Sequence, residues 1–372
     1  MPKRGENIRK RKDGRWEARI IDFYTSNGKA HYKYIYSKSY TEVKILKKDF
    51  NIQKDKYINT QKKLSTSISE ICTEWLNKNK IKIKQSTYAT YHRIIHNHII
   101  PYFNNTEVKD ITNTAVQKFI EDKYDNGNDL SVKTIRDITS VLLQIIKHAE
   151  KEKYISNFDY DICLPKLQKK EFEILTGIEE QKLNSYLKNN LTLINFGVIL
   201  AKETGIRIGE LCSLKVSDID INNGTIEITK TIQRIKNFDT DIKAKTKIII
   251  TTPKSQKSIR IIPLSDSIIS IVKKLYKNYN SDCYILTGTT KYIEPRIFQK
   301  KFKEIISDIK IKNITVHSLR HFFATKAVEN GFDIKSLSEI LGHATVKFTL
   351  DIYVHSSFEL KRNNMNKIAS CF

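Results

Sequence analysis

The pattern of apolar and polar residues changes twice along the 372-residue chain. In residues 1–60, short runs of aromatic and β-branched residues are separated by Asp13-Gly14 and Asn27-Gly28, which are dipeptides that favour tight hairpin turns. This pattern predicts a three-stranded antiparallel sheet. The spacing of apolar residues in the stretch that follows predicts a helix over residues 41–57. We therefore expect the first segment to be a small α+β domain.

In residues 65–155, apolar residues recur every three or four positions, which is the period of an amphipathic helix. Breaks are expected near Pro101 and Gly127. The segment is predicted to be a bundle of four or five helices. His92, His96 and His98 invite a metal-site interpretation, but no carboxylate or thiol lies beside them at ligand spacing, so a polar surface helix is preferred.

A polar link through Pro165 leads into the third segment, residues 170–372. Its first helix is expected to begin with a capping box formed by Thr176 and Glu179. Alternating residues predict strands around a hairpin turn at residues 253–258, and the remainder is predicted to be helical. The expected fold is mainly α with small β-sheets, divided into domains at residues 1–60, 65–155 and 170–372.

Composition points to a polyanionic partner. Lys and Arg number 65 against 41 Asp and Glu, which gives a formal net charge of +24. Nucleic acid is the expected partner, with an acidic membrane surface second. No apolar run has the roughly 20 residues that a membrane span needs, and the first residues lack the apolar segment of a signal peptide. The five cysteines are far apart without a C-x-x-C pair, so reduced cytosolic thiols are expected.

Basic and aromatic side chains interleave in the first segment, on a sheet too small for much of a core. That arrangement suits a strand face laid into a DNA groove, and the alternative is a plain small domain with a solvated basic face. The candidate DNA-contacting residues are Arg9, Lys10, Arg11, Lys12, Arg15, Arg19, Lys29 and Lys33.

Candidate chemistry is concentrated in the third segment. The stretch "TVHSLRHFFATKAVENGF" places His317 and Arg320 on one face at the start of a helix, an arrangement that suits an anion. In "ETGIRIGELCSL", Arg207 and Glu210 are also expected to share a helix face, which alone is typical of a surface ion pair. Lys254 lies in the expected hairpin turn, with Lys257 three residues on.

Two further residues complete the set. Gly342 is expected to end a helix and to leave His343 exposed beyond it, and Tyr353 follows ten residues later. Paired arginines clamp a phosphate, Lys and His move protons, and a tyrosine beside positive charge is activated as a nucleophile. Because no Asp/Glu constellation suited to Mg²⁺ is apparent, these residues predict phosphoryl transfer without a metal or another cofactor.

The order Arg…Lys…His-x-x-Arg…Leu-Gly-His…Tyr resembles that of the tyrosine recombinase (phage integrase) family. The stretches "TGIRIGEL", "HSLRHFFAT" and "LGHATVKFTLDIYVH" are similar to the motifs of that family. The helical segment resembles the family's core-binding domain. The basic first segment resembles the arm-site-binding domains of phage and conjugative-transposon integrases.

The resemblance implies a reaction with assigned roles. Tyr353 would attack a scissile DNA phosphate to give a 3′-phosphotyrosyl link. The other roles are phosphate binding by Arg207, Arg320 and His343, orientation or acceptance of the tyrosine proton by His317, protonation of the leaving 5′-oxygen by Lys254 with Lys257 as the alternative, and orientation of Arg207 by Glu210. The implied partners are double-stranded DNA at core and arm sites, three further copies of the chain, an excisionase and a host DNA-bending protein, in a bacterial cytoplasm on the nucleoid.

The sequence allows alternative interpretations of the tail and of the activity. The tail residues Phe358, Leu360, Met365 and Ile368 suit an amphipathic helix that docks on a neighbouring copy, and the alternative is a frayed polar terminus. A chromosome-dimer resolvase, a type IB topoisomerase-like enzyme and a non-catalytic DNA-binding regulator are alternatives to a mobile-element integrase. The extra basic segment favours the integrase over the resolvase, and Tyr353 with both arginines disfavours the regulator.

Overall fold

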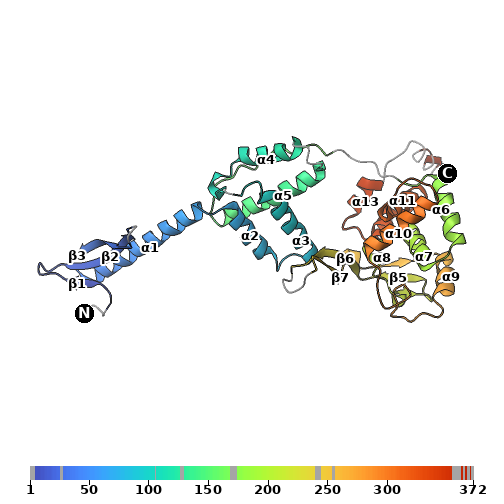
Figure 1. The fold of residues 1–372 in the computed structure, drawn as a ribbon, viewed down its shortest axis with the longest axis horizontal. Coiled ribbons are helices and arrows are strands. Elements are labelled where there is room, and N and C mark those ends of the chain that lie inside the picture. The colour runs from blue at the N-terminus through green and yellow to red at the C-terminus, as the bar shows by residue number, and fades with distance from the viewer. Residues whose placement is uncertain are drawn as a thin grey trace. The chain divides into compact units, whose positions relative to one another are not determined.

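The computed structural model describes residues 5–25, 28–104, 106–125, 130–167, 174–238, 244–253 and 256–353, together with 362, 365, 366 and 369. The side chains of residues 56–64 and 256 lie outside this description, as do Lys254 and three of the four tail residues named above. The chain divides into two compact units, residues 1–168 and 169–372 (Figure 1). The predicted fold class, mainly α with small antiparallel sheets, is confirmed.

The predicted N-terminal sheet is confirmed. Strands β1 (Ile8–Lys10), β2 (Trp16–Tyr24) and β3 (Ala30–Ser37) pair antiparallel in that order. Helix α1 (Tyr40–Leu64) covers one face of the sheet, where Ala18 packs with Val43. This helix is longer than the predicted span of 41–57, because the extra residues at its C-terminal end include only two apolar ones, Ile58 and Leu64, which are too few to show a helical period.

The predicted helical bundle is also confirmed within the described residues. It comprises α2 (Ile68–Asn79), α3 (Gln85–Ile94), α4 (Asn113–Asp125) and α5 (Val132–Lys151). Helix α3 continues into one π-helical turn, Ile95–Ile99, which carries His96 and His98. The link after α5 packs its apolar residues Phe158, Ile162 and Leu164 against the bundle core, so this core extends beyond the predicted boundary at residue 155.

The C-terminal unit is built around two contacting helices, α7 (Leu193–Thr204) and α11 (Val316–Glu329), which Figure 1 shows side by side. Phe196, Phe298, Phe302 and Leu319 lie fully buried in its core. The other helices are α6 (Gly177–Asn189), α8 (Ile208–Leu211), α9 (Asp266–Leu275), α10 (Pro295–Asp308), α12 (Ile334–Leu341) and α13 (Val346–Tyr353). The predicted capping box of Thr176 and Glu179 begins α6.

The strand region differs from the prediction. Strand β6 (Thr231–Lys236) pairs with β7 (Thr246–Thr251) in one two-stranded sheet. Strand β5 (Thr225–Ile228) lies between β4 (Ile219–Asp220) and β8 (Arg260–Pro263) in another sheet. Residues 253–258 therefore connect two sheets and do not form the turn of a hairpin, because β7 pairs with β6 and β8 pairs with β5.

Candidate active site

Arg207 lies between two helices and not within one, contrary to the sequence prediction. Gly205, at φ +64°, ends α7 in the left-handed conformation, and the extended backbone of Arg207 then caps the start of α8. Its Nη1 lies 2.9 Å from Glu210 Oε1, and its Nη2 donates to the carbonyl of Gly342 at 2.9 Å. Arg207 is therefore held from two sides while about a third of its side chain, 36%, stays exposed.

Glu210 is not part of a surface ion pair, because it is only 2% exposed. Its second oxygen, Oε2, accepts a hydrogen bond of 2.8 Å from Arg260 Nη2. Burial acts to raise the pKa of Glu210, but the hydrogen bond and charge of Arg260, and then those of Arg207, outweigh it and lower the pKa. A buried carboxylate is thus charged and shared between two arginines.

Arg260 was missed by the sequence analysis. It begins β8 as a buried residue, and besides Glu210 it donates to the carbonyls of Ser258, at 3.0 Å, and Ile340. The available signal was the alternation in "SIRIIP", in which Arg260 occupies the same face as Ile262 and is buried like it. A charged residue at an inward position of a strand needs buried partners.

Arg320 is the most deeply buried of the three arginines, at 2% exposure. Its Nη1 donates to the carbonyl of Gly205 at 2.8 Å and its Nη2 to that of Leu341 at 2.7 Å. Burial, with the charges of Arg207 and Arg260, lowers the pKa of Arg320 to about 9, so the guanidinium stays charged at neutral pH.

The end of α12 organises this positive cluster. Three successive carbonyls, those of Ile340, Leu341 and Gly342, each accept a hydrogen bond from one arginine: Arg260, Arg320 and Arg207 respectively. The last carbonyls of a helix lack partners within it and carry the negative end of the helix dipole. The C-terminus of α12 therefore fixes three guanidinium groups relative to one another.

His343 follows Gly342, which ends α12 at φ +64° as predicted. The prediction that His343 is exposed is wrong, since it is only 7% exposed. The chain turns back so that α13 covers the ring, whose Nδ1 lies 2.8 Å from Thr349 Oγ1. Burial and the charges of Arg320 and Arg207 are the main causes that lower the pKa of His343 to about 3, so its imidazole is neutral at pH 7.

Tyr353, the last residue of α13, is buried at 7% exposure. Its hydroxyl lies 2.8 Å from His321 Nδ1, and its ring is nearly parallel to that of His343. Burial raises the pKa of Tyr353, although the charges of Arg320 and Arg207 and a hydrogen bond from Arg320 act in the opposite direction. The phenol is therefore protonated at neutral pH, and the charges of both arginines act on it.

The histidine beside Tyr353 is not the one that the sequence analysis selected. His317 is exposed near the start of α11, and its ring meets the ring of His321 edge-on at 4.6 Å. His321, four residues later on the same helix face, makes the contact with the phenol. The available signal for His321 was that it is the second histidine of "HSLRH". Its contact with the phenol depends on where α13 places Tyr353.

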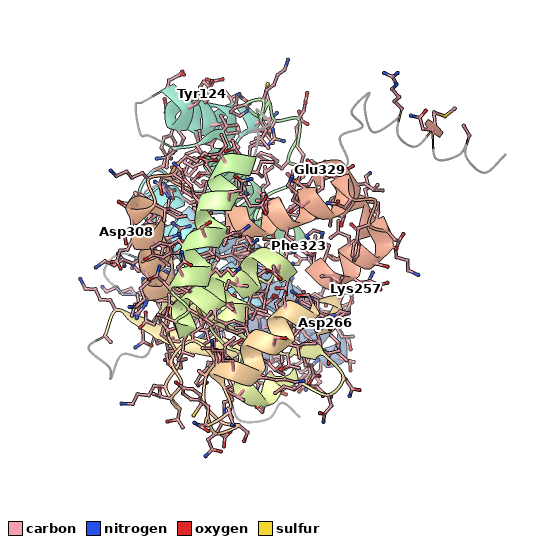
Figure 2. The ribbon with its side chains drawn as sticks, turned by 90° about the vertical axis from the view of Figure 1, so that its right-hand side faces the viewer. Tyr124, Lys257, Asp266, Asp308, Phe323 and Glu329 are labelled. Carbon is pink, nitrogen blue, oxygen red and sulfur yellow. The ribbon has the colours of Figure 1, made fainter. Side chains whose placement is uncertain are left out.

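Of the two candidate lysines, the structure describes only Lys257. Lys254 lies outside the described residues. Lys257 is exposed, and its Nζ donates to the carbonyl of Ala344 at 3.0 Å, beside the turn between α12 and α13 (Figure 2). Among the described residues, no three His, Cys, Asp or Glu side chains lie close enough together to hold a metal ion. No described helix is both long and apolar enough to cross a bilayer.

The candidate DNA-contacting residues fall on two faces of the N-terminal sheet. Side chains alternate along a strand, so the residues on the face of Glu17 point away from α1. That open face carries Arg9 and Arg11, paired with Glu17, Arg15 over the Tyr36 ring, and Arg19 over the Tyr32 ring at 4.4 Å. Lys10 and Lys33 lie on the helix-covered side, over Trp16 and Phe50, and all four lysines, including Lys12 and Lys29, are exposed.

Comparison with known proteins identifies the chain. The model of the phage integrase family matches residues 167–359, and that of the phage integrase N-terminal SAM-like domain matches residues 67–124. A tyrosine recombinase XerC-like protein of Caldanaerobacter subterraneus is 26% identical, over 94% of this chain and 98% of the relative. The ICEBs1 integrase of Bacillus subtilis is 25% identical, over 79% of this chain and 80% of its own length.

Solved structures share the fold. The integrase of transposon Tn1549 in complex with transposon right end DNA has a TM-score of 0.69 and 19% identity, over 82% of this chain and all of that one. A lambda integrase tetramer bound to a Holliday junction has a TM-score of 0.59 and 17% identity, over 95% and 98% of the two chains. Since the first family model alone spans more than half of the 372 residues, this protein belongs to the phage integrase family.

Proposed function

We propose that this protein is the site-specific DNA recombinase of a mobile element, which cuts and rejoins strands through a 3′-phosphotyrosyl intermediate. The observation that supports this best is the Tyr353 hydroxyl, buried beside Arg320 in a chain of the phage integrase family. A protein that only bound DNA would have no use for a nucleophile in that position. The names of the relatives, which are integrases and recombinases, agree with this function.

In the proposed site, Arg207 and Arg320 bind the non-bridging oxygens of the scissile phosphate. A guanidinium has five N–H groups, and the bonds to Glu210 and to backbone carbonyls use two of them in each case. Because those bonds fix both groups before DNA arrives, little reorganisation is needed when charge develops in the transition state. Loss of one such preorganised donor typically costs about 3–4 kcal/mol of barrier.

The chemical step conserves the phosphodiester energy. The Tyr353 oxygen forms a bond to phosphorus and gives up its proton to a histidine near the start of α11, while the bond from phosphorus to the 5′-oxygen breaks. The leaving 5′-oxygen takes a proton from Lys254 or Lys257, and attack by the 5′-hydroxyl of another strand reverses the sequence. His343, neutral and buried beside the phenol, is proposed as a further donor to the phosphate.

Strand exchange between two duplexes needs four such sites, so a homotetramer on DNA is the proposed assembly. The proposed domains are residues 1–60 for arm-site DNA, 65–155 for core-site DNA and 170–372 for catalysis. The open face of the N-terminal sheet, with arginines over tyrosine rings, supports the arm-binding role. Bacterial relatives support action in a bacterial cytoplasm, where an excisionase and a DNA-bending protein would assist.

The test is a DNA duplex that carries the core site of the host element, nicked so that the cleaved strand end diffuses away. We expect a covalent protein–DNA adduct in the presence of EDTA, and recombination only when two sites are supplied. An absolute requirement for divalent metal would contradict the proposal. Relaxation of supercoiled DNA without paired sites would favour a topoisomerase-like enzyme instead.

A further inference from the structure

Two histidines lie on the first turns of α11, and they differ in what they contact. His317 is exposed, whereas His321 is buried at 7% exposure with its Nδ1 2.8 Å from the Tyr353 hydroxyl. A contact of this length is a hydrogen bond, in which the phenol donates when His321 carries its ring hydrogen on Nε2. The sequence pattern alone favours His317 for this position, so the contact changes which residue can act on the nucleophile.

The neighbours of the phenol leave His321 as its acceptor. Arg320 can only donate, and its guanidinium acts to lower the pKa of Tyr353. The His343 ring lies parallel to the Tyr353 ring, with its Nδ1 engaged by Thr349. Burial, with the nearby His317 and Arg320, lowers the pKa of His321 to about 4, so its imidazole is neutral at pH 7 and can accept a proton.

We infer that His321 is the catalytic residue that accepts the Tyr353 proton when the phenol attacks DNA, an assignment that rests on the proposed function. As the bond from the tyrosine oxygen to phosphorus forms, the phenolic proton moves to His321 Nδ1. The bond to the 5′-oxygen breaks, and that oxygen is protonated by the lysine. In the rejoining direction, His321 returns its proton to the departing tyrosine.

The electrostatics of the site fit a transfer that is coupled to attack. Before DNA binds, burial disfavours a proton on His321, and the charges of His317 and Arg320 act in the same direction. The scissile phosphate brings negative charge to Arg207 and Arg320 and offsets that repulsion. The phenol also becomes a much stronger acid as its oxygen bonds to phosphorus, so His321 need not deprotonate free tyrosine.

The first measurement compares His321→Asn and His321→Ala with wild type, by single-turnover adduct formation on the nicked duplex at saturating protein. Asparagine can accept the phenolic hydrogen bond but cannot take the proton at neutral pH. We expect both variants to be slower by roughly 100-fold or more, within the range of general base catalysis. A His321→Asn rate equal to or above that of wild type would overturn the assignment.

The second measurement separates proton transfer from a structural defect. Tyr353 is replaced by a trifluorotyrosine, whose phenol is a much stronger acid than that of tyrosine and therefore depends far less on a base. In that background we expect the His321→Asn defect to shrink to about threefold or less, as expected when the base is needed far less. A defect of unchanged size would show that His321 acts through structure alone and would overturn the inference.

The Tyr353→Phe variant distinguishes failure of the inference from failure of the proposed function. Loss of the adduct in Tyr353→Phe with a wild-type rate in His321→Asn contradicts only the role of His321. Persistence of the adduct in Tyr353→Phe contradicts the proposed function itself.

Discussion

Arg260 Nη2 lies 2.8 Å from Glu210 Oε2, and Glu210 in turn pairs with Arg207 through its other oxygen. The position of Arg207, a proposed phosphate-binding residue, therefore depends on Arg260, because the two arginines share the Glu210 carboxylate. Because both Glu210 and Arg260 are buried, this arrangement cannot exchange its partners for water.

Replacing Arg260 should weaken both stability and cleavage. Arg260→Leu leaves the Glu210 carboxylate buried with one partner fewer, and breaking a buried pair costs about 3–5 kcal/mol of unfolding free energy. The matched control is Arg234→Leu, because Arg234 pairs with Glu294 on the surface, where such a pair contributes about 1 kcal/mol or less. Urea unfolding measures both changes, and equal losses would contradict the structural role of Arg260.

The same variant should also slow adduct formation under conditions where it is folded. Without Arg260, Glu210 is drawn to one side and Arg207 loses a fixed partner. We expect Arg260→Leu to slow cleavage by roughly tenfold or more at saturating DNA, whereas Arg234→Leu should cleave at the wild-type rate. A folded Arg260→Leu protein with normal cleavage would show that Arg207 does not depend on this network.

Gly342→Ala should disturb the cluster of Arg207, Arg260 and Arg320, because the added methyl group meets Arg260 in addition to straining the backbone. Gly342 is at φ +64°, and an added Cβ would lie 3.1 Å from atoms of the Arg260 side chain. The control is Gly28→Ala, at φ +75° with nothing within 4 Å, where only the cost of about 1–2 kcal/mol for left-handed backbone applies. We expect adduct formation to fall in Gly342→Ala and to be retained in Gly28→Ala, as measured on core-site DNA.

The N-terminal sheet offers a charge-matched test of arm-site binding. Arg15→Ala with Arg19→Ala removes two charges from the open face, and Lys10→Ala with Lys33→Ala removes two from the helix-covered side. We expect the first pair to weaken binding to arm-site DNA at least about tenfold more than the second, because base-edge contacts contribute beyond charge. If the two double variants lose the same affinity for arm-site DNA at one salt concentration, the sheet attracts DNA by non-specific charge only.

Acid should destabilise the C-terminal unit through His343. Burial and the arginines lower its folded pKa to about 3, whereas the unfolded chain takes up the proton near pH 6.5. The stabilising contribution is therefore complete above about pH 6.5 and is lost as the pH falls toward 3. Urea unfolding at several pH values should show a smaller acid loss in His343→Asn than in wild type, and an unchanged profile would contradict this.

Sequence spacing found the residues whose identity is tied to a motif, but not the residues defined by contacts across the fold. The order of Arg207, Arg320 and Tyr353 was readable because a phosphate clamp and a nucleophile need those residue types. Arg260 and His321 act through partners 50 and 32 positions away, which no local pattern encodes.

Burial was misjudged for the same reason. Ending a helix at Gly342 was predictable from the residue type, but whether His343 then faced solvent depended on the packing of α13 over it. The predicted pairing of β7 with β8 was wrong for the same reason. Strand β7 pairs with β6 and strand β8 with β5, both of which precede them in the sequence.

The central claim is that Tyr353 becomes joined to a DNA phosphate beside Arg207 and Arg320. Peptide mapping by mass spectrometry of the adduct trapped on the nicked duplex in EDTA tests it directly. We predict a 3′-phosphate linked to Tyr353 in wild type and no adduct in Tyr353→Phe. A link to another residue, or to a 5′-phosphate, would contradict it.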